Sequence, residues 1–205
     1  GNRLSTIRSQ QNWLYNDNNQ LTQADNISYQ YDLNGNLTKK ADASNGQIHN
    51  YIYNTERRLI KIEDQNQQTV AQYYYNPFGQ RLSKKVKGIT TFYLYSQEGL
   101  VAEYSQTGNL QTEYHYQPDG AWMTNPLFMR TTYNEVLYYH NDHSGAPQAL
   151  YNKQGQLKWQ ANYSAFGQAE ILKDLVDQNL RFAGQYYDQE SGLHHNYLRD
   201  YDPAQ

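Results

Sequence analysis

The chain has 205 residues, and its 17 basic and 20 acidic side chains give a formal net charge of −3. This balance argues against a nucleic-acid-binding domain, which normally carries a basic surface. No run of about 18 apolar residues is present and no secretory signal peptide is recognisable, so we expect no membrane span. Cysteine is absent, which excludes disulfides and thiolate metal sites.

The aromatic content indicates a folded chain with an unusual core. Hydrophobic residues make up 38% of the chain, but 22 of them are tyrosine. Disordered chains contain few aromatic residues, so simple disorder is disfavoured. A tyrosine can bury its ring while its hydroxyl stays in water. The composition therefore predicts a thin sheet with at least one wet face.

A tyrosine-led repeat runs along the chain. Leucine lies six residues after tyrosine in five copies, which pair Tyr15 with Leu21, Tyr31 with Leu37, Tyr53 with Leu59, Tyr104 with Leu110 and Tyr151 with Leu157. Three looser copies begin at Tyr75 (ending at Leu82), Tyr95 and Tyr163. Glycine lies four residues after tyrosine in six of the eight copies, at Gly35, Gly79, Gly99, Gly108, Gly155 and Gly167. We expect the tyrosines and leucines to form the repeat core and the glycines to form its turns.

The repeat has the chemistry of a β-hairpin. Segments such as Tyr29-Gln30-Tyr31 alternate with period two, which is the strand signal. Asp32, or Asn or Ser in other copies, can start a type I turn in which the glycine takes the left-handed position. Arg57 replaces the glycine in one copy and tolerates a positive φ poorly, so a different turn is expected there.

These signals predict an all-β fold of repeated β-hairpins stacked in a continuous curved antiparallel sheet. One segment departs from the pattern, because the apolar residues of 170–180 have helical spacing and predict a short helix: Ile171, Leu172, Leu175 and Val176. Residues 118–135 read as an insertion or long loop.

The motif Y-D-x-x-G-N-L resembles the YD repeat of the RHS-repeat family. Tyr138 to Pro147 is similar to the family signature YYHxDHLGSP, and Leu180 to Tyr197 resembles the start of the RHS-repeat-associated core domain. Arg199-Asp200-Tyr201-Asp202-Pro203 matches the R-D-Y-D-P of that domain. The resemblance divides the chain into a YD-repeat sheet (1–117), the insertion (118–135) and the core region (136–205), which we expect to be truncated at its C-terminal end.

The resemblance implies a segment of a hollow shell, or cocoon, that encloses a C-terminal toxin domain before delivery from a bacterium. The partners implied are the rest of the shell, the toxin, and spike or adaptor proteins of a type VI or similar secretion route in interbacterial competition. Such a chain is cytoplasmic before export. In the family the core region cleaves itself by an aspartyl-protease-like reaction. Arg199 and Asp200 would be one half of that site, with the second aspartate beyond Gln205, so this chain is expected to be non-enzymatic, without cofactor or metal.

Other assignments compete with this one. An aromatic-repeat module that binds carbohydrate or a cell surface is the alternative function, but the three tryptophans occupy no fixed repeat position. His140, Asp142 and His143 could supply metal ligands, although structural hydrogen bonding is favoured. We expect Asp188 and Glu190 to be solvated turn carboxylates. Paired lysines, such as Lys84-Lys85, read as solvated charges that protect a sheet edge.

Overall fold

The computed structural model describes residues 4–5, 13–182 and 184–204, which contain strands and turns but no helix. The chain divides into two compact units, Gly1–Tyr73 and Tyr74–Ala204, and each is described by itself. The division falls inside the strand Thr69–Tyr75, and the hydrogen-bonded pairing of strands continues through this point. The predicted boundaries at 117 and 135 stay a prediction.

The first unit is a meander of short antiparallel strands. Its buried centre consists of Trp13, Leu21, Ala24 and Tyr29, with further buried residues such as Ile62 along the later strands. The strands are β1 (Leu14–Tyr15), β2 (Leu21–Ala24), β3 (Ile27–Tyr31), β4 (Leu37–Asp42), β5 (Gln47–Tyr53), β6 (Leu59–Glu63) and β7 (Thr69–Tyr75).

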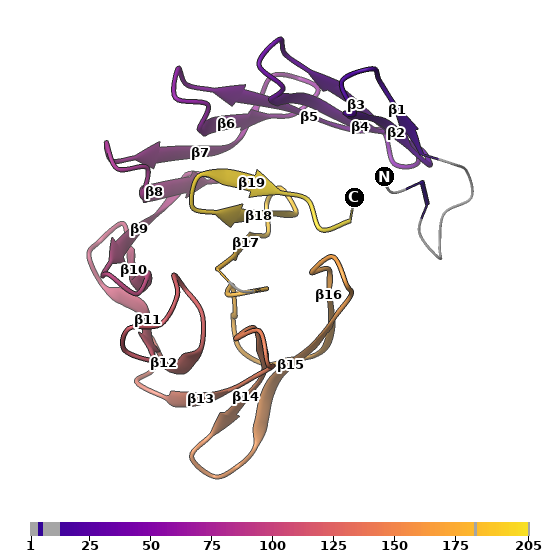
Figure 1. Cartoon of the computed structure of the whole chain (residues 1–205). Coiled ribbons are helices and arrows are strands. Elements are labelled where there is room, and N and C mark those ends of the chain that lie inside the picture. The colour runs from indigo at the N-terminus through magenta and orange to yellow at the C-terminus, as the bar shows by residue number, and fades with distance from the viewer. Residues whose placement is uncertain (1–3, 6–12, 183, 205) are drawn as a thin grey trace. The chain divides into compact units, whose positions relative to one another are not determined.

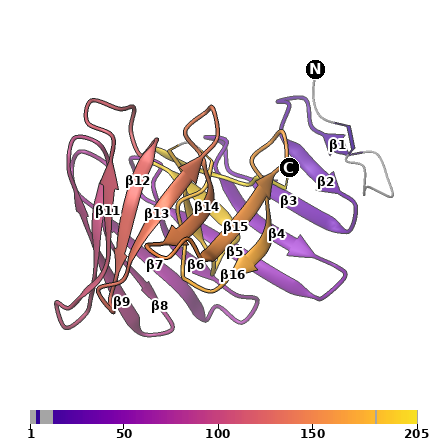
Figure 2. The same cartoon turned by 90° about the horizontal axis from the view of Figure 1, so that it is seen from below.

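The second unit continues the meander and then turns back on itself. Its strands are β8 (Arg81–Val86), β9 (Ile89–Tyr95), β10 (Leu100–Ser105), β11 (Leu110–Tyr116), β12 (Pro126–Thr131), β13 (Val136–Asn141), β14 (Pro147–Asn152), β15 (Leu157–Tyr163), β16 (Ala169–Asp174), β17 (Tyr186–Asp188), β18 (Leu193–Asn196) and β19 (Arg199–Tyr201). Strands β8 to β16 curve around a separate three-stranded sheet, β17 to β19 (Figure 1 and Figure 2).

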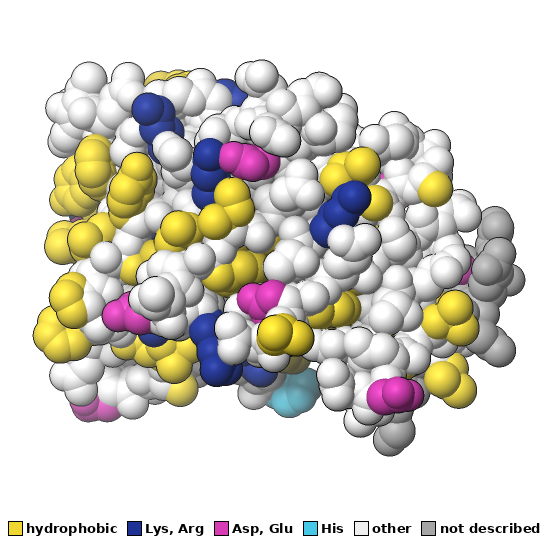
Figure 3. Space-filling view, turned by 90° about the horizontal axis from the view of Figure 1, so that it is seen from above, with side chains coloured by type: hydrophobic (Ala, Val, Ile, Leu, Met, Phe, Trp, Pro, Cys, Tyr) yellow, Lys and Arg dark blue, Asp and Glu magenta, His cyan; other side chains and the backbone are white. Residues whose placement is uncertain are grey.

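The predicted all-β class is confirmed. Strands β1 to β16 are hydrogen-bonded in chain order into one antiparallel sheet that does not close on itself. In the second unit the concave face carries the core, which includes Tyr114, Met129, Leu137 and Trp159. The other face is open to solvent, and Phe92 is 46% exposed there. Figure 3 shows one face of the chain, on which hydrophobic side chains lie in small groups between charged ones.

The six-residue spacing of the repeat is explained by strand register. In the five exact copies the turn is followed by a β-bulge, and the bulge sets the tyrosine directly opposite the leucine of the same copy. Tyr31 pairs with Leu37 in this way, and Tyr53 pairs with Leu59. Leu21 and Leu59 are buried, whereas Leu37, Leu110 and Leu157 are half-buried. Tyrosines two residues before the turn tyrosine, such as Tyr29 and Tyr73, are buried as well.

The turns are closed by one side chain each. At Asp32 the Oδ1 atom accepts hydrogen bonds from the backbone N–H groups of Asn34 and Asn36, both at 2.9 Å. Gly35 donates its N–H to the Asp32 carbonyl and has a φ of 84°. The same hydrogen bonds recur at Asn76 and Asn152. The six repeat glycines all have a positive φ, between 73° and 136°.

The expectation of a different turn at Arg57 is wrong. Arg57 has a φ of 62°, and its N–H bonds to the Asn54 carbonyl as the glycines do in the other copies. The Asn54 side chain accepts the N–H groups of Glu56 and Arg58, at 3.0 and 2.9 Å. These local bonds and the flanking ladder outweigh the cost of a left-handed arginine, which is about 1–2 kcal/mol.

The helix predicted near 170–180 is also absent. Residues Ala169–Asp174 form strand β16, which pairs with β15 through partners such as Trp159 and Asp174. Ile171 and Leu172 are 40% and 52% exposed. A helix would need an apolar stripe packed on one side, but these residues lie on an edge strand whose ladder satisfies its backbone instead.

Candidate functional site

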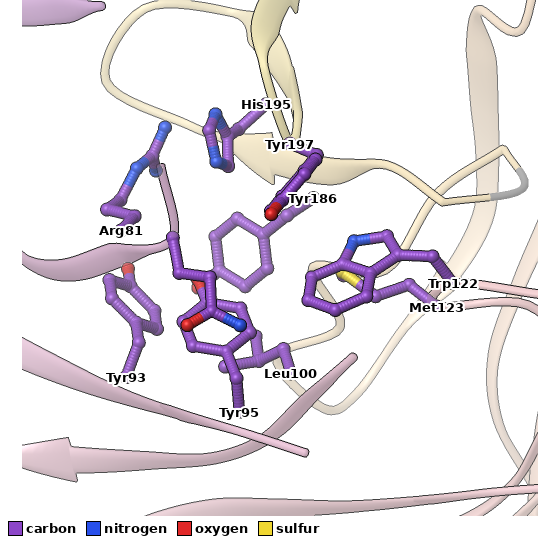
Figure 4. A pocket seen from close by; sticks show the side chains of 10 residues that line it. Arg81, Tyr93, Tyr95, Leu100, Trp122, Met123, Tyr186, His195 and Tyr197 are labelled. Atoms are coloured by element: carbon purple, nitrogen blue, oxygen red, sulfur yellow. The ribbon is translucent and has the colours of Figure 1, made fainter. Parts of the chain in front are cut away.

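The candidate site lies where the three-stranded sheet β17 to β19 packs on the concave face of β8 to β11. Several residues of this contact come together in one cluster around Tyr186, whose ring lies among side chains from both sheets (Figure 4). All of them belong to the second unit. The cluster has a polar part around Arg81 and an aromatic part around Trp122.

Arg81 occupies a position that belongs to leucine elsewhere. It lies six residues after Tyr75, as Leu59 lies six residues after Tyr53, and it is equally buried, with 1% exposure. The looser alignment that ended this copy at Leu82 is therefore corrected, because Leu82 is 45% exposed. Because the Arg81 side chain is only 2% exposed, its guanidinium must find an anion inside the protein.

That anion is Asp188 at the end of β17. Arg81 donates a hydrogen bond from Nη1 to Oδ1 of Asp188 at 2.7 Å, and its Nη2 lies 2.7 Å from Oδ2 in the same ion pair. Lys84 adds its Nζ at 2.9 Å from Asp188 and 3.1 Å from Glu190. Asp188 and Glu190 thus have buried side chains that form ion pairs with strand β8, and the expectation that they are solvated turn carboxylates is wrong.

The charges of this cluster control its protonation. Burial alone would raise the pKa of Asp188, but the charges of Arg81 and Lys84 outweigh it and hold that pKa well below the ordinary value. Burial lowers the pKa of Lys84, but the charges around it, first Asp188 and then Tyr93 and Glu190, together outweigh burial and raise that pKa overall. The Lys84 side chain is 13% exposed and paired with acids, which corrects its assignment as a solvated edge charge, whereas Lys85 is exposed.

Asp200 lies at the edge of the same cluster. It pairs with His195 across β18 and β19, and its Oδ1 is 3.5 Å from the His195 Nδ1. The Arg81 Nη2 is 3.8 Å from the same oxygen. Burial, followed by the charge of Arg81, lowers the pKa of His195. Arg199 is exposed and makes no ion pair with the residues that the structure describes, so the structure brings Asp200, but not Arg199, to the cluster.

A buried carboxylate marks the other side of Tyr186. Glu103 accepts hydrogen bonds from the hydroxyls of Tyr114, at 2.6 Å, and Tyr186, at 3.0 Å. Burial raises the pKa of Glu103 and outweighs these bonds. Lys84 lies 5.4 Å from the centre of the Tyr186 ring. Tyr186 is therefore held at its hydroxyl by one strand and at its ring by another.

Aromatic contacts complete the docking of the small sheet. Trp122 stacks on Tyr95 with ring centroids 5.8 Å apart and contacts Tyr197 at 4.9 Å. Tyr201 donates its hydroxyl to the carbonyl of Phe166 at 2.8 Å. The cavity left at the Trp122 end has a volume of about 10 Å³, which is room for a single water and no ligand.

The remaining predicted residues serve the fold. Asp142 closes its own turn by accepting the N–H groups of Ser144 and Ala146, and the described residues contain no group of three side chains arranged for a metal ion. Trp13 and Trp159 are buried, at 4% and 1% exposure, and Trp122 is stacked, so none of them offers a free ring for a sugar. No helix within the described ranges is long and apolar enough to cross a membrane.

Sequence reasoning missed Arg81 and Glu103, and it assigned Lys84 and Asp188 to solvated positions. One signal was present, since Arg81 breaks the leucine spacing of its copy. The partners could not be found, because nothing local in the sequence couples β8 to β17.

The fold and the docked C-terminal sheet define a segment of a β-sheet repeat shell. A family model described as Teneurin YD-shell matches residues 1–205, so the chain belongs to the Teneurin YD-shell family. The resemblance to RHS/YD-repeat proteins is thereby confirmed, and the chain is a structural segment of a YD-repeat shell.

Known relatives agree with this family. The chain is 29% identical over 222 residues to double-stranded DNA deaminase toxin A of Burkholderia cenocepacia, covering 92% of this chain and 15% of the relative. It is 32% identical over 193 residues to the probable deoxyribonuclease RhsB of Dickeya dadantii, covering 90% and 13%. The Photorhabdus luminescens Tc holotoxin pore shares the fold, with a TM-score of 0.53 and 15% identity over 98% of this chain and 12% of that one. The chain thus spans no more than 15% of these relatives.

Proposed function

We propose that the chain forms part of the wall of a shell that encloses a C-terminal toxin domain of the same protein before delivery. The observation that carries this proposal is the docking of β17 to β19 on the concave face of the second unit, through the buried Arg81–Asp188 pair. A domain that follows β19 would start on the concave side. Relatives that are named as a toxin and a deoxyribonuclease support an active C-terminal domain in the parent protein.

Asp200 is proposed as one carboxyl group of a self-cleavage site in the parent protein. In such a reaction an ionised carboxylate takes a proton from water, the water oxygen bonds to the peptide carbonyl carbon, and the carbon–nitrogen bond breaks as the nitrogen receives a proton. A second carboxyl group must supply that proton. The position of Asp200 beside His195 and Arg81, at 3.5 and 3.8 Å, supports the assignment because a reacting carboxylate needs fixed neighbours.

The proposal also includes delivery of the parent protein. We expect the parent protein to be exported from a bacterium with the help of spike or adaptor proteins, by a type VI or similar route, and to act in competition between bacteria. The wall itself needs no catalytic group for this role.

The test is the product pattern of the native gene. Intact mass spectrometry should find a shell product and a separate C-terminal fragment that stays bound to the shell and resists added protease. Asp200→Asn should leave one uncut chain with the same shell. Asp202→Asn is the control, because it changes the neighbouring acid, whose side chain caps the Ala204 N–H at 3.0 Å, and this variant should be cut as the wild type is. If the Asp200→Asn protein is still cut, Asp200 is not part of the self-cleavage site. If added protease degrades the C-terminal fragment at once, the shell does not enclose it.

A further inference from the structure

The arginine that faces Asp200 comes from the repeat wall and not from its own strand. The Nη2 atom of Arg81 lies 3.8 Å from the Asp200 Oδ1, whereas Arg199, the sequence neighbour of Asp200, is exposed. Arg81 belongs to β8, far upstream in the chain. The wall thus contributes a charge to the C-terminal half-site.

Arg81 is held in one orientation. The turn before it is closed by the Asn76 side chain, which accepts the N–H groups of Phe78 and Gln80, at 3.0 and 2.9 Å. Its side chain is 2% exposed, and one hydrogen bond from Nη1 and an ion-pair contact from Nη2, each 2.7 Å from an Asp188 oxygen, hold the guanidinium in place. An arginine that was only a structural replacement for leucine would not need to reach the next acid as well.

We infer that Arg81 is a positioning residue for Asp200, so that the half-site reaches its cleavage geometry only when β17 to β19 have docked on a folded wall. This inference rests on the proposed self-cleavage role of Asp200. Its consequence is a folding checkpoint: a chain whose wall is incomplete lacks the cation that orders Asp200, and the toxin stays attached.

The charged neighbours of Asp200 make the inference measurable. His195 faces it from β18 at 3.5 Å, Arg81 faces it from β8, and the Tyr75 hydroxyl and the Asp188 carboxylate lie in the same cluster. Of these, only Arg81 holds a fixed positive charge against the Asp200 carboxylate. Removing that charge takes away the cation that faces the Asp200 Oδ1, so cleavage should slow, and a variant that keeps the charge should recover part of the rate.

The experiment measures self-cleavage of the native gene product after refolding, from pH 4 to pH 9. Arg81→Leu restores the residue of the other repeats but leaves Lys84 as the remaining cation beside Asp188, so docking of β17 to β19 must be measured in the same variant. We expect it to slow cleavage by about 10- to 100-fold, the usual cost of a misplaced catalytic group. Arg81→Lys keeps the charge, so it should recover part of the rate. Lys85→Met is the matched control, because Lys85 is exposed next to the cluster, and it should behave as the wild type.

Each outcome decides between the two proposals. If Asp200→Asn is inactive but Arg81→Leu cleaves at the wild-type rate, the inference fails and the role of Asp200 stands. Slower cleavage that a docked Arg81→Lys protein does not recover gives Arg81 a purely structural role and also overturns the inference. If Asp200→Asn still cleaves, the proposed function fails first and the inference with it. Hydrogen exchange of β18 shows whether the sheet stays docked. If Arg81→Leu undocks it, Arg81→Lys decides, and a docked Arg81→Lys protein that cleaves no faster than Arg81→Leu refutes the inference.

Discussion

The substitution Asp188→Asn tests how strongly the small sheet is held. It keeps the shape of the side chain but leaves Arg81 and Lys84 without the anion that lies 2.7 and 2.9 Å from them. The side chains of Arg81 and Asp188 are each 2% exposed, so water cannot replace the lost partner. Breaking a buried pair from one side costs about 3–5 kcal/mol, and we expect that loss in the free energy of opening β17 to β19.

Hydrogen exchange of the β18 amides measures this opening directly, and urea unfolding followed through the second unit gives the global value. With a slope of about 2–3 kcal/mol per molar urea, the midpoint should fall by roughly 1–2 M if opening and unfolding are coupled. Glu135→Gln is the control, because its pair with Lys158 is 3.3 Å long and has side-chain exposures of 42% and 25%. Exposed pairs contribute about 0–1 kcal/mol, so this variant should unfold almost as the wild type does.

Acid gives a second measurement of the same pair. The folded pKa of Asp188 is depressed, so its contribution is present above the unfolded value of about 3.9 and is lost as pH falls toward the folded value. The difference between wild type and Asp188→Asn should therefore be constant from pH 5 to pH 8 and shrink below about pH 4. The double variant Arg81→Leu with Asp188→Leu should be more stable than Asp188→Asn alone, because no charge is left unpaired at that position. A single-variant cost below about 1 kcal/mol, or a double variant less stable than the single one, would refute this reasoning.

Three further predictions concern single sites, each read by urea or thermal unfolding. Gly108→Ala should lower the free energy of unfolding by about 1–2 kcal/mol, because the φ of 79° is strained for alanine although a Cβ there meets nothing within 4 Å. Gly145→Ala should lower it clearly more, because its φ is 81° and a Cβ would also lie 2.9 Å from Asn125. Equal losses for the two variants would show that contact with Asn125 adds no cost. Arg57→Gly should stabilise the first unit by about 0.5–1 kcal/mol by relieving a φ of 62°, and a loss of stability would show that the left-handed arginine is not strained. Burial lowers the pKa of His194 to about 4. The neutral form of His194 therefore contributes fully to stability above pH 6.5, and the free energy of unfolding falls by up to about 3 kcal/mol as the pH drops toward 4. His194→Asn should remove most of this pH dependence, and an unchanged pH dependence would assign it to other groups.

The sequence alone determined what is repeated and local. The turn at Asp32 is determined by five consecutive residues, because its hydrogen bonds from the Asp32 side chain and from Gly35 all lie within that segment. Register follows from the same motif, since the bulge after the turn sets Tyr31 against Leu37. The all-β class and the antiparallel chain-order sheet were predictable for that reason.

Tertiary structure decided the features that depend on distant partners. Residues 169–174 have helical spacing but become β16, because pairing with β15 satisfies the backbone on that edge. Arg57 adopts a glycine conformation because the surrounding ladder imposes it. Arg81 and Asp188 each look like ordinary surface residues in the sequence. They become a buried ion pair only when β17 folds back onto β8, and a buried charge selects its partner by proximity in space, which sequence spacing does not record.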